Sequence, residues 1–388
     1  MAEENYINIL DFGSSKIRFS VFDLNKKKKF SKNKEVLLVD NYDNHFDNLD
    51  IIIKEAEKEI SYHVEDIILL FDSIDLLTID ISLNKNLYKY SQVKKIYNLL
   101  LLELNQLINT YYSNQYLIHI LMDKCIIDNK EIFTDLPKEK FINNNLKVDF
   151  KIFCLPKIVI KKLKDKFIKK NLKITNIFLT SYLKSYSYAK KLNKNKISFL
   201  EIGLQRASFI FYKTNKLKFI KTIPIGGSHI TKDIANIFKI NLDDAEKLKK
   251  SFSRSDTEFS YKDNSSENAM LAKEILDKNI SIDLLKKVIL YRVQEIINLS
   301  FAKSSNISYI NELHNTDLFL IGEGSMIFND NSFYLEDKFK FKSINFFAES
   351  DSEICNCALT YNLNNPALQT ITVKKQGIFE KFFNYFSK

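Results

Sequence analysis

The spacing of apolar residues at the start of the chain predicts strands followed by a helix. Tyr6–Phe12 and Ile17–Phe22 are short apolar runs, and we expect a third strand at Glu35–Val39. Apolar residues recur at helical spacing over Leu49–Ile60, and Asp66–Phe71 is a continuous apolar run typical of a buried strand. These elements predict an α/β lobe over residues 1–72.

The pattern changes over residues 73–153, where we expect a small inserted α+β subdomain. A helix is expected at Ser91–Tyr111, and strands are expected at Tyr116–Met122 and Val148–Cys154. After this insertion, isoleucine, valine and leucine recur at helical spacing over Lys157–Lys170, with lysines on the opposite face. This helix returns the chain to the first lobe.

A second lobe is expected from Lys196 onward. An apolar run ends at Gly203 and a second one returns at Ala207–Tyr212, which repeats the strand–turn–strand pattern of the N-terminus. This repetition predicts two related halves that face one ligand. Further elements are expected in the order strand Leu217–Ile223, helix after Gly227, helix Leu242–Lys250, helix Leu284–Phe301 and strand Asp317–Ile321.

Composition narrows the class of protein. The chain has 388 residues, of which 45% are hydrophobic, enough for one large core or two lobes and too many for a disordered chain. No run reaches the roughly 18–20 apolar residues of a spanning helix, and the N-terminus lacks the pattern of a signal peptide. Of the four cysteines, only Cys355 and Cys357 are close, without a neighbouring histidine. We therefore expect a reduced cytoplasmic protein without a cysteine metal site.

The net charge of +10 does not indicate a nucleic-acid partner. The whole chain is rich in Lys, Asn, Ile and Phe, so the positive charge is spread out rather than gathered in one patch. The run Lys26–Lys29 stands between two strand-like runs and predicts a solvated hairpin loop. No aromatic–basic motif of the RRM type is present.

Glycine is scarce in this chain, and its positions are informative. There are seven glycines, where average usage would give roughly 27. Six of them fall in four short loops that each follow a strand-like run, although ordinary tight turns are the alternative interpretation. Because glycine lets the backbone approach a ligand closely, we expect at least two of these loops to cradle a phosphate or nucleotide. The six are Gly13, Gly203, Gly226, Gly227, Gly322 and Gly324.

Three segments carry a resemblance to a known family. They are DFGSSK from Asp11, the stretch KISFLEIGLQRASFIFY from Lys196 with IPIGGSHITKDIANIF and DDAEKLK after it, and LFLIGEGSMIF from Leu318. At these residues the chain resembles the actin/Hsp70/sugar-kinase fold, and most closely the FtsA family of bacterial cell-division proteins. The order and spacing fit over nearly the whole chain, and the segment from Ile223 to Lys249 is the most specific.

The resemblance implies an α/β, actin/Hsp70-like fold of two lobes and four subdomains around a cleft that holds ATP and Mg²⁺. Residues 1–72, 154–195 and about 345–365 would form the first lobe, with an SHS2-like insertion at 73–153. The second lobe would cover residues 196–344, with 228–306 as its outer subdomain. A linker at 366–375 and an amphipathic helix at 376–388 would follow.

The resemblance also assigns roles within the cleft. Asp11 and Ser14–Lys16 would contact the phosphates, with Asp11 reaching Mg²⁺ through water. Glu246 and Lys249 would reach the ribose and adenine, and Gly322–Ser325 would lie against the adenosine. The full ATP-binding set is Asp11, Gly13, Ser14, Ser15, Lys16, Glu201, Gly203, Arg206, Gly226, Gly227, Glu246, Lys249, Gly322, Glu323, Gly324 and Ser325.

The second phosphate loop departs from the family pattern. It normally has the pattern Asp-x-Gly-Gly-Gly-Thr-Thr, but this chain has Glu201, a single glycine at Gly203, and Arg206 with Ala207 in place of the hydroxyls. Glu323 also replaces a usual glycine. Arg206 would either pair with phosphate or lie on the surface. We assign no catalytic residue and expect at most slow ATP hydrolysis.

The C-terminus predicts a membrane-binding helix from its own pattern. At about 100° per residue, the apolar side chains of residues 378–386 fall within roughly 160° of arc, and lysines flank them. The alternative is a terminal helix packed on the protein's own core. The predicted membrane-binding residues are Ile378, Phe379, Lys381, Phe382, Phe383, Phe386 and Lys388.

The family resemblance implies an adaptor. It would bind the C-terminal tail of the tubulin-like protein FtsZ through residues 228–306, self-associate through residues 73–153, and contact other division proteins. It would lie on the anionic inner face of the cell membrane at the division site. The alternatives are a PilM-like ATP-binding protein of pilus assembly, and an ATPase or phosphotransferase of the actin fold. The altered second phosphate loop offers the last of these no evident base.

Overall fold

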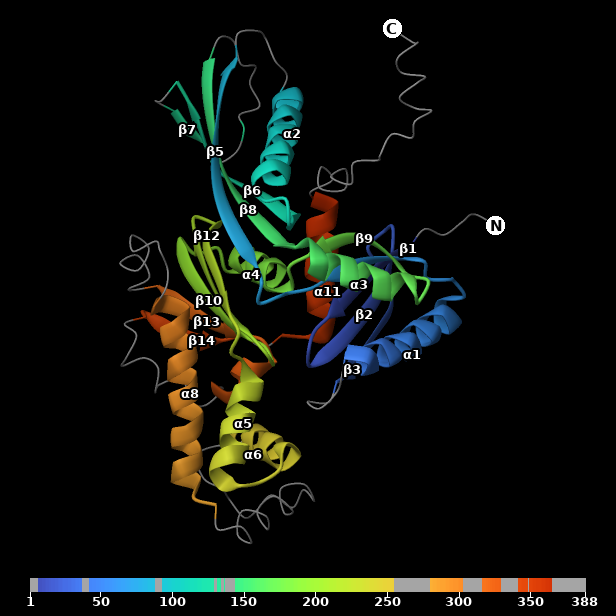
Figure 1. The fold of residues 1–388 in the computed structure, drawn as a ribbon, viewed down its shortest axis with the longest axis vertical. Coiled ribbons are helices and arrows are strands. Elements are labelled where there is room, and N and C mark those ends of the chain that lie inside the picture. Colours follow the sequence, from blue (N-terminus) through green and yellow to red (C-terminus); the bar gives the residue numbers. More distant parts are fainter. Residues whose placement is uncertain are drawn as a thin grey trace.

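The computed structural model describes residues 6–36, 42–87, 93–128, 131–133, 136, 144–254, 280–302, 316–328, 341–347 and 349–364. The predicted linker at 366–375 and amphipathic helix at 376–388 lie outside these ranges. Figure 1 shows two lobes side by side, with an inserted subdomain projecting from the first. Within the described ranges, no helix combines the length and apolar character that crossing a membrane requires.

The first lobe is built on a five-stranded sheet with the order β3-β2-β1-β4-β9. β1 pairs antiparallel with β2 and parallel with β4, which pairs parallel with β9. Phe12 contacts Phe46 of α1 and Phe167 of α3, so these two helices cover one face of the sheet. The elements are β1 (Tyr6–Phe12), β2 (Lys16–Asp23), β3 (Lys28–Glu35), α1 (Tyr42–Ile60), β4 (Asp66–Leu70), α3 (Lys157–Ile168), β9 (Lys173–Phe178), α4 (Thr180–Leu192) and α11 (Asp351–Asn364).

The second lobe repeats this topology. Its sheet has the order β12-β11-β10-β13-β14, with an antiparallel three-stranded part and then two parallel strands, as in the first lobe. The predicted duplication of the strand–turn–strand unit is therefore confirmed. The elements are β10 (Lys196–Ile202), β11 (Ala207–Lys213), β12 (Lys216–Ile223), α5 (Gly227–Phe238), α6 (Leu242–Arg254), α8 (Ile282–Ala302), β13 (Asp317–Ile321), the 3-10 helix η1 (Glu323–Phe328) and β14 (Ser343–Phe346).

Helix α4 joins the two lobes through a shared core. It contacts α11 of the first lobe and strands β10 and β11 of the second. Tyr212 of β11 lies in the same apolar cluster as Tyr182 of α4, and its hydroxyl pairs with Ser185 at 3.0 Å. The residues that face the cleft from α4 are therefore held between two sheets, and burial of large aromatic rings stabilises this arrangement.

The inserted subdomain has its own sheet, with the order β5-β8-β6-β7 and antiparallel pairs. Leu100 and Leu104 of α2 pack with Phe150 in a separate apolar core. Phe153, in contrast, belongs to the core of the first lobe, so the base of the insertion is continuous with that lobe. The elements are β5 (Leu77–Leu87), α2 (Val93–Tyr111), β6 (Gln115–Ile127), β7 (Glu131–Phe133) and β8 (Asn144–Pro156).

The third strand does not lie where the sequence predicted it. We expected it at Glu35–Val39, but it covers Lys28–Glu35 and begins inside the lysine run. The turn before it is closed by Asp23, whose carboxylate accepts a hydrogen bond from the Lys27 backbone N–H at 2.8 Å, while Lys26 has a φ of 66°. β3 lies at the edge of the sheet and buries only Phe30, so the strand needs few apolar residues, and its lysines disfavour pairing with another chain.

Candidate functional site

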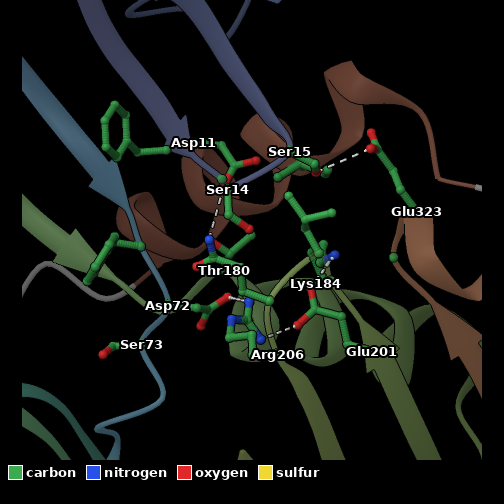
Figure 2. Close-up of a pocket in the computed structure, with 18 of the residues that line it drawn as sticks. Asp11, Ser14, Ser15, Asp72, Ser73, Thr180, Lys184, Glu201, Arg206 and Glu323 are labelled. Carbon is green, nitrogen blue, oxygen red and sulfur yellow. Dashed lines mark hydrogen bonds and ion pairs between the residues drawn. The ribbon is translucent and has the colours of Figure 1, made fainter. Parts of the chain in front are cut away.

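A cavity of about 370 Å³ lies where the two hairpin turns face each other. Figure 2 shows polar side chains of both lobes pointing into it. The first lobe contributes Asp11, Gly13, Ser14, Ser15, Arg18, Asp72, Thr180, Lys184 and Glu349, and the second contributes Glu201, Gly203, Arg206, Gly322 and Glu323. Most predicted phosphate-side residues are thus brought together, although they are far apart in the sequence.

Matching positions in the two sheets place carboxylates at this cavity. In the first lobe, Asp11 is the second-last residue of β1 and lies opposite Leu70 of the parallel strand β4, and Asp72 follows that strand. In the second lobe, Glu201 pairs with Ile321 of β13, and Glu323 follows. Ligand sites of open α/β sheets lie at the carboxyl ends of parallel strands, so the topology directs all four carboxylates to one cleft.

The carboxylate of Asp11 is buried and fully engaged. Its Oδ2 accepts a hydrogen bond from Arg18 at 2.9 Å, and its Oδ1 accepts one from the Thr180 hydroxyl at 3.1 Å. Burial raises the pKa of Asp11, and the positive charges of Arg18 and Lys184 oppose that rise. Neither oxygen is left without a donor.

Glu201 holds the corresponding position in the second lobe. Its Oε1 accepts from Lys184 at 2.6 Å, and its Oε2 accepts from Arg206 at 2.9 Å. Burial alone would raise the pKa of Glu201, but these two cations lower it to about 2. Glu201 is therefore ionised at neutral pH.

Arg206 connects the two lobes. Its guanidinium donates hydrogen bonds to Glu201 of its own lobe and to Asp72 of the first lobe. It also donates to the Ser208 hydroxyl at 2.9 Å. Asp72 also accepts hydrogen bonds from the backbone N–H and the hydroxyl of Ser181, at 2.9 and 2.8 Å, at the N-terminus of α4. The Arg206 side chain is 16% exposed, so it lies in the cleft and not on the surface.

A second connection between the lobes involves Glu323. Its Oε1 accepts from Arg18 at 2.6 Å and from Lys16 at 2.8 Å, and its Oε2 accepts from the Ser15 hydroxyl at 3.3 Å. Arg18 also donates to Asp351 of α11 at 2.5 Å. The residue that replaces a glycine in the predicted adenosine loop therefore contacts the first phosphate loop.

The predicted ribose and adenine residues lie outside the residues that line this cavity. Lys249 is 5% exposed, and its ammonium group donates to Thr231 at 2.8 Å and to the Gly227 carbonyl at 3.2 Å. Glu246 accepts from Lys249 and Thr231, at 2.5 Å in each case. Their role toward an adenosine stays a prediction.

The glycines of the second lobe pack mainly against backbone. A Cβ at Gly226 would lie 2.5 Å from the Gly203 carbonyl oxygen, and one at Gly324 would lie 2.7 Å from the Ile202 carbonyl oxygen. Gly322 has a φ of +86°, which only glycine adopts without strain. Ser325 donates to the Gly322 carbonyl at 2.6 Å and so closes the same loop. Of the predicted glycines, Gly13, Gly203 and Gly322 line the cavity, whereas Gly226, Gly227 and Gly324 support the loops behind it.

The carboxylates of Asp11 and Glu201 do not fit direct coordination of the predicted magnesium ion. Both oxygens of Asp11 and both oxygens of Glu201 already accept hydrogen bonds from side chains. Among the described residues, no group of three or more Asp, Glu, His or Cys side chains could hold a metal ion. We therefore derive no metal contact for Asp11.

Several cleft residues carried no recognised signal in the sequence. Arg18 could have been found, because it lies directly opposite Asp11 in the β1–β2 hairpin register. Asp72 could have been found as the acidic residue after a buried parallel strand. Thr180, Lys184 and Glu349 come from elements that the apolar pattern did not single out, and only the tertiary structure places them in the cleft.

Sequence comparison supports the family resemblance. Residues 199–335 match the family model described as Cell division protein FtsA. The chain is 24% identical over 190 residues to the cell division protein FtsA of Bacillus subtilis (strain 168), in a match that covers 48% of this chain and 42% of that relative. The match therefore spans less than half of the relative's length.

Structural comparison supports the fold over most of the chain. The chain is similar to a solved structure described as the PilM-PilN type IV pilus biogenesis complex, with a TM-score of 0.57 and 14% sequence identity. That similarity covers 90% of this chain and 89% of the other.

The repeated sheets and the cleft between them define a protein of the actin/Hsp70-like fold. Within that class, residues 199–335 are similar to the FtsA family of cell-division proteins.

Proposed function

We propose that this chain is an FtsA-like adaptor of cell division, which self-associates and tethers the FtsZ ring to the inner face of the cell membrane at the division site. An ATP-type nucleotide would bind in the cleft. The proposal includes contacts with the C-terminal tail of FtsZ, with an anionic lipid surface and with other division proteins.

One observation carries this proposal: residues 199–335 match the FtsA family model. That segment includes α5, α6 and α8, the described part of the subdomain in which we place the FtsZ groove. The predicted signature Ile223–Gly227 lies within it and forms the entry to α5.

The nucleotide part of the proposal is supported by the cleft. The first hairpin turn presents Gly13, Ser14 and Ser15 to the cavity, and the second presents Gly203. Turns of this kind can present backbone N–H groups to phosphate oxygens, whereas the N–H of Gly203 itself donates to the Arg206 carbonyl at 2.9 Å. Arg18, Lys184 and Arg206 place three cationic side chains around the same space.

The membrane part of the proposal rests on the sequence of residues 376–388. Four phenylalanines on one face and flanking lysines are typical of a helix that lies in the lipid interface. Burial of a large apolar side chain contributes about 1.5–3 kcal/mol at most. A single copy would bind weakly, so assembly into filaments would be needed for firm attachment.

Co-sedimentation with anionic lipid vesicles, FtsZ and ATP tests the proposal. We expect the full chain to bring FtsZ to the vesicles, and FtsZ without its C-terminal tail to stay in solution. Phe382→Asp with Phe386→Asp should release the chain from vesicles while it still binds the FtsZ tail. The proposal would be contradicted if FtsZ that lacks its C-terminal tail sediments with the vesicles, or if the double variant still binds them.

The PilM-like alternative is tested in the same assay. A peptide from the N-terminus of a pilus-assembly partner replaces FtsZ, and we expect no binding. Steady ATP turnover by the purified chain would favour the third candidate, an actin-fold ATPase or phosphotransferase, over the adaptor.

A further inference from the structure

We propose that the Lys184 ammonium group takes the place of a divalent metal ion in this cleft, so that the cleft closes without Mg²⁺. The inference deepens the proposed function, because it rests on the cleft being the nucleotide site. Glu201 and Glu349 are the carboxylates that could bind a metal ion at this point, and both form ion pairs with Lys184 instead. The measurements below need neither nucleotide nor FtsZ, so they can fail independently of the proposed function.

Lys184 is positioned as a bridging cation. It comes from α4 in the first lobe, is 4% exposed, and donates to Glu201 of the second lobe at 2.6 Å and to Glu349 at 3.2 Å. Glu349 is also bound by the Gly322 backbone N–H at 3.0 Å and by the Tyr188 hydroxyl at 3.2 Å. Figure 2 shows Lys184 pointing at Glu201 within the cavity.

The charge balance explains why this ammonium group stays ionised. Burial alone would lower the pKa of Lys184, but Glu201, Glu349 and Asp11 together raise it above its usual value. Removal of one partner from a buried pair leaves an uncompensated charge, which is strongly unfavourable. Without Lys184, Glu201 and Glu349 would therefore be left facing each other with one fewer cation.

Two further cations each occupy one carboxylate oxygen of a hairpin. Arg18 engages Asp11, and Arg206 engages the second oxygen of Glu201. Direct coordination of Mg²⁺ by a side chain needs a carboxylate oxygen that is open to the ion. In this cleft the carboxylates of both hairpins already have cationic partners, and the pairs Lys184–Glu201 and Arg206–Asp72 connect the two lobes across the same space.

The decisive comparison is between the wild type and Lys184→Met, with thermal unfolding measured in EDTA and in excess Mg²⁺ or Mn²⁺. We expect the wild type to unfold at the same temperature in EDTA and in either metal. We expect Lys184→Met to unfold at a lower temperature in EDTA and to recover part of the loss when metal is added, because metal can then bridge Glu201 and Glu349.

Three control variants keep the test specific. Lys184→Arg retains the charge and should remain indifferent to metal. Lys184→Met combined with Glu201→Gln removes the facing carboxylate and should lose the response to metal. Lys191→Met removes an exposed lysine of the same helix, paired with Glu353 at 2.7 Å, and should behave as the wild type does.

Two results would overturn the inference. The first is a wild type that gains stability with Mg²⁺ and loses this gain in Glu201→Gln. The second is a Lys184→Met variant whose unfolding temperature does not change with metal. If Lys184→Met does not fold, electron paramagnetic resonance measures Mn²⁺ binding by the wild type instead. A Mn²⁺ site that is present in the wild type and lost in Glu201→Gln would overturn the inference. The absence of such a Mn²⁺ site would support the inference.

Discussion

Arg206 in the second lobe donates a hydrogen bond to Asp72 in the first lobe, across the mouth of the cleft. Asp72 in turn accepts from the first turn of α4, so the guanidinium is connected to the helix that carries Lys184. The replacement of hydroxyls in the second phosphate loop by this arginine therefore creates a link between lobes. Because Glu201 shares the same guanidinium, the link lies at the centre of the ion-pair network.

Removal of this link should destabilise the whole molecule. We expect Arg206→Ala to lower the free energy of unfolding by about 3–5 kcal/mol, since Asp72 and Glu201 would both lose a buried partner. Thermal unfolding followed by circular dichroism measures the change. The matched control is Arg292→Ala, which removes an arginine paired with Asp233 and Glu295 inside the second lobe, at its surface. A loss equal to that of the control, about 0–1 kcal/mol, would show that the interlobe link contributes little.

Two adjacent glycines should respond differently to the same substitution. A Cβ at Gly226 would meet three backbone atoms of the Gly203–Arg206 turn at 2.5–2.8 Å, whereas the nearest atoms to a Cβ at Gly227 lie at 3.6 Å. We expect Gly226→Ala to cost about 1–3 kcal/mol through this overlap, and Gly227→Ala to cost less. Equal unfolding temperatures for the two variants would show that the turn can shift to accommodate a methyl group.

His119 should make the stability of the protein depend on pH. It is fully buried, its Nε2 accepts the Leu179 backbone N–H at 3.0 Å, and burial lowers its pKa to about 3. The unfolded chain takes up a proton near pH 6.5, so the folded state loses stability as the pH falls from 6.5 toward 3, by at most about 1.4 kcal/mol per pH unit. This stability is fully present above pH 6.5.

His119→Gln tests this contribution, because glutamine offers a hydrogen-bonding group without a proton to gain. The measurement is the unfolding midpoint between pH 7.5 and 5, compared with the wild type. We expect the variant to show a smaller decline toward acid, even if it is less stable at every pH. Parallel curves for the two proteins would exclude His119 as a source of the pH dependence.

Self-association through the inserted subdomain makes a prediction about α2. Leu99 and Leu102 lie one helical turn apart with exposures of 61% and 59%. An exposed apolar pair on a helix suits contact with a second copy, so we expect Leu99→Asp with Leu102→Asp to abolish filaments on lipid. Electron microscopy and pelleting on vesicles measure this.

The control for that prediction is a pair of equal exposure elsewhere. Ile158 and Ile168 of α3 are each 63% exposed, and their replacement by aspartate should leave filaments intact. Filaments formed by the α2 variant, or lost in the α3 variant, would place the contact outside the inserted subdomain.

Local pattern alone determined much of the architecture. Strands β1, β2, β10 and β11 bury one or both faces, so their apolar runs mark them without knowledge of their partners. The duplicated hairpin followed from two such runs with similar turns. The third strand was misplaced because β3 is an edge strand that buries only Phe30 and so lacks an apolar run.

Only the tertiary structure decided what the cleft residues do. Arg206 was expected either to bind phosphate or to lie on the surface, yet it is paired with Asp72, 134 positions earlier in the chain. Lys184 belongs to a helix whose sequence gives no sign of a ligand, and its neighbours Glu201 and Glu349 come from other elements. Apolar periodicity depends on which residues are buried, and it carries no information on which buried charges meet. That choice is made by the docking of α4 between the two sheets, because an ion pair in a low-dielectric interior depends on the separation of its charges.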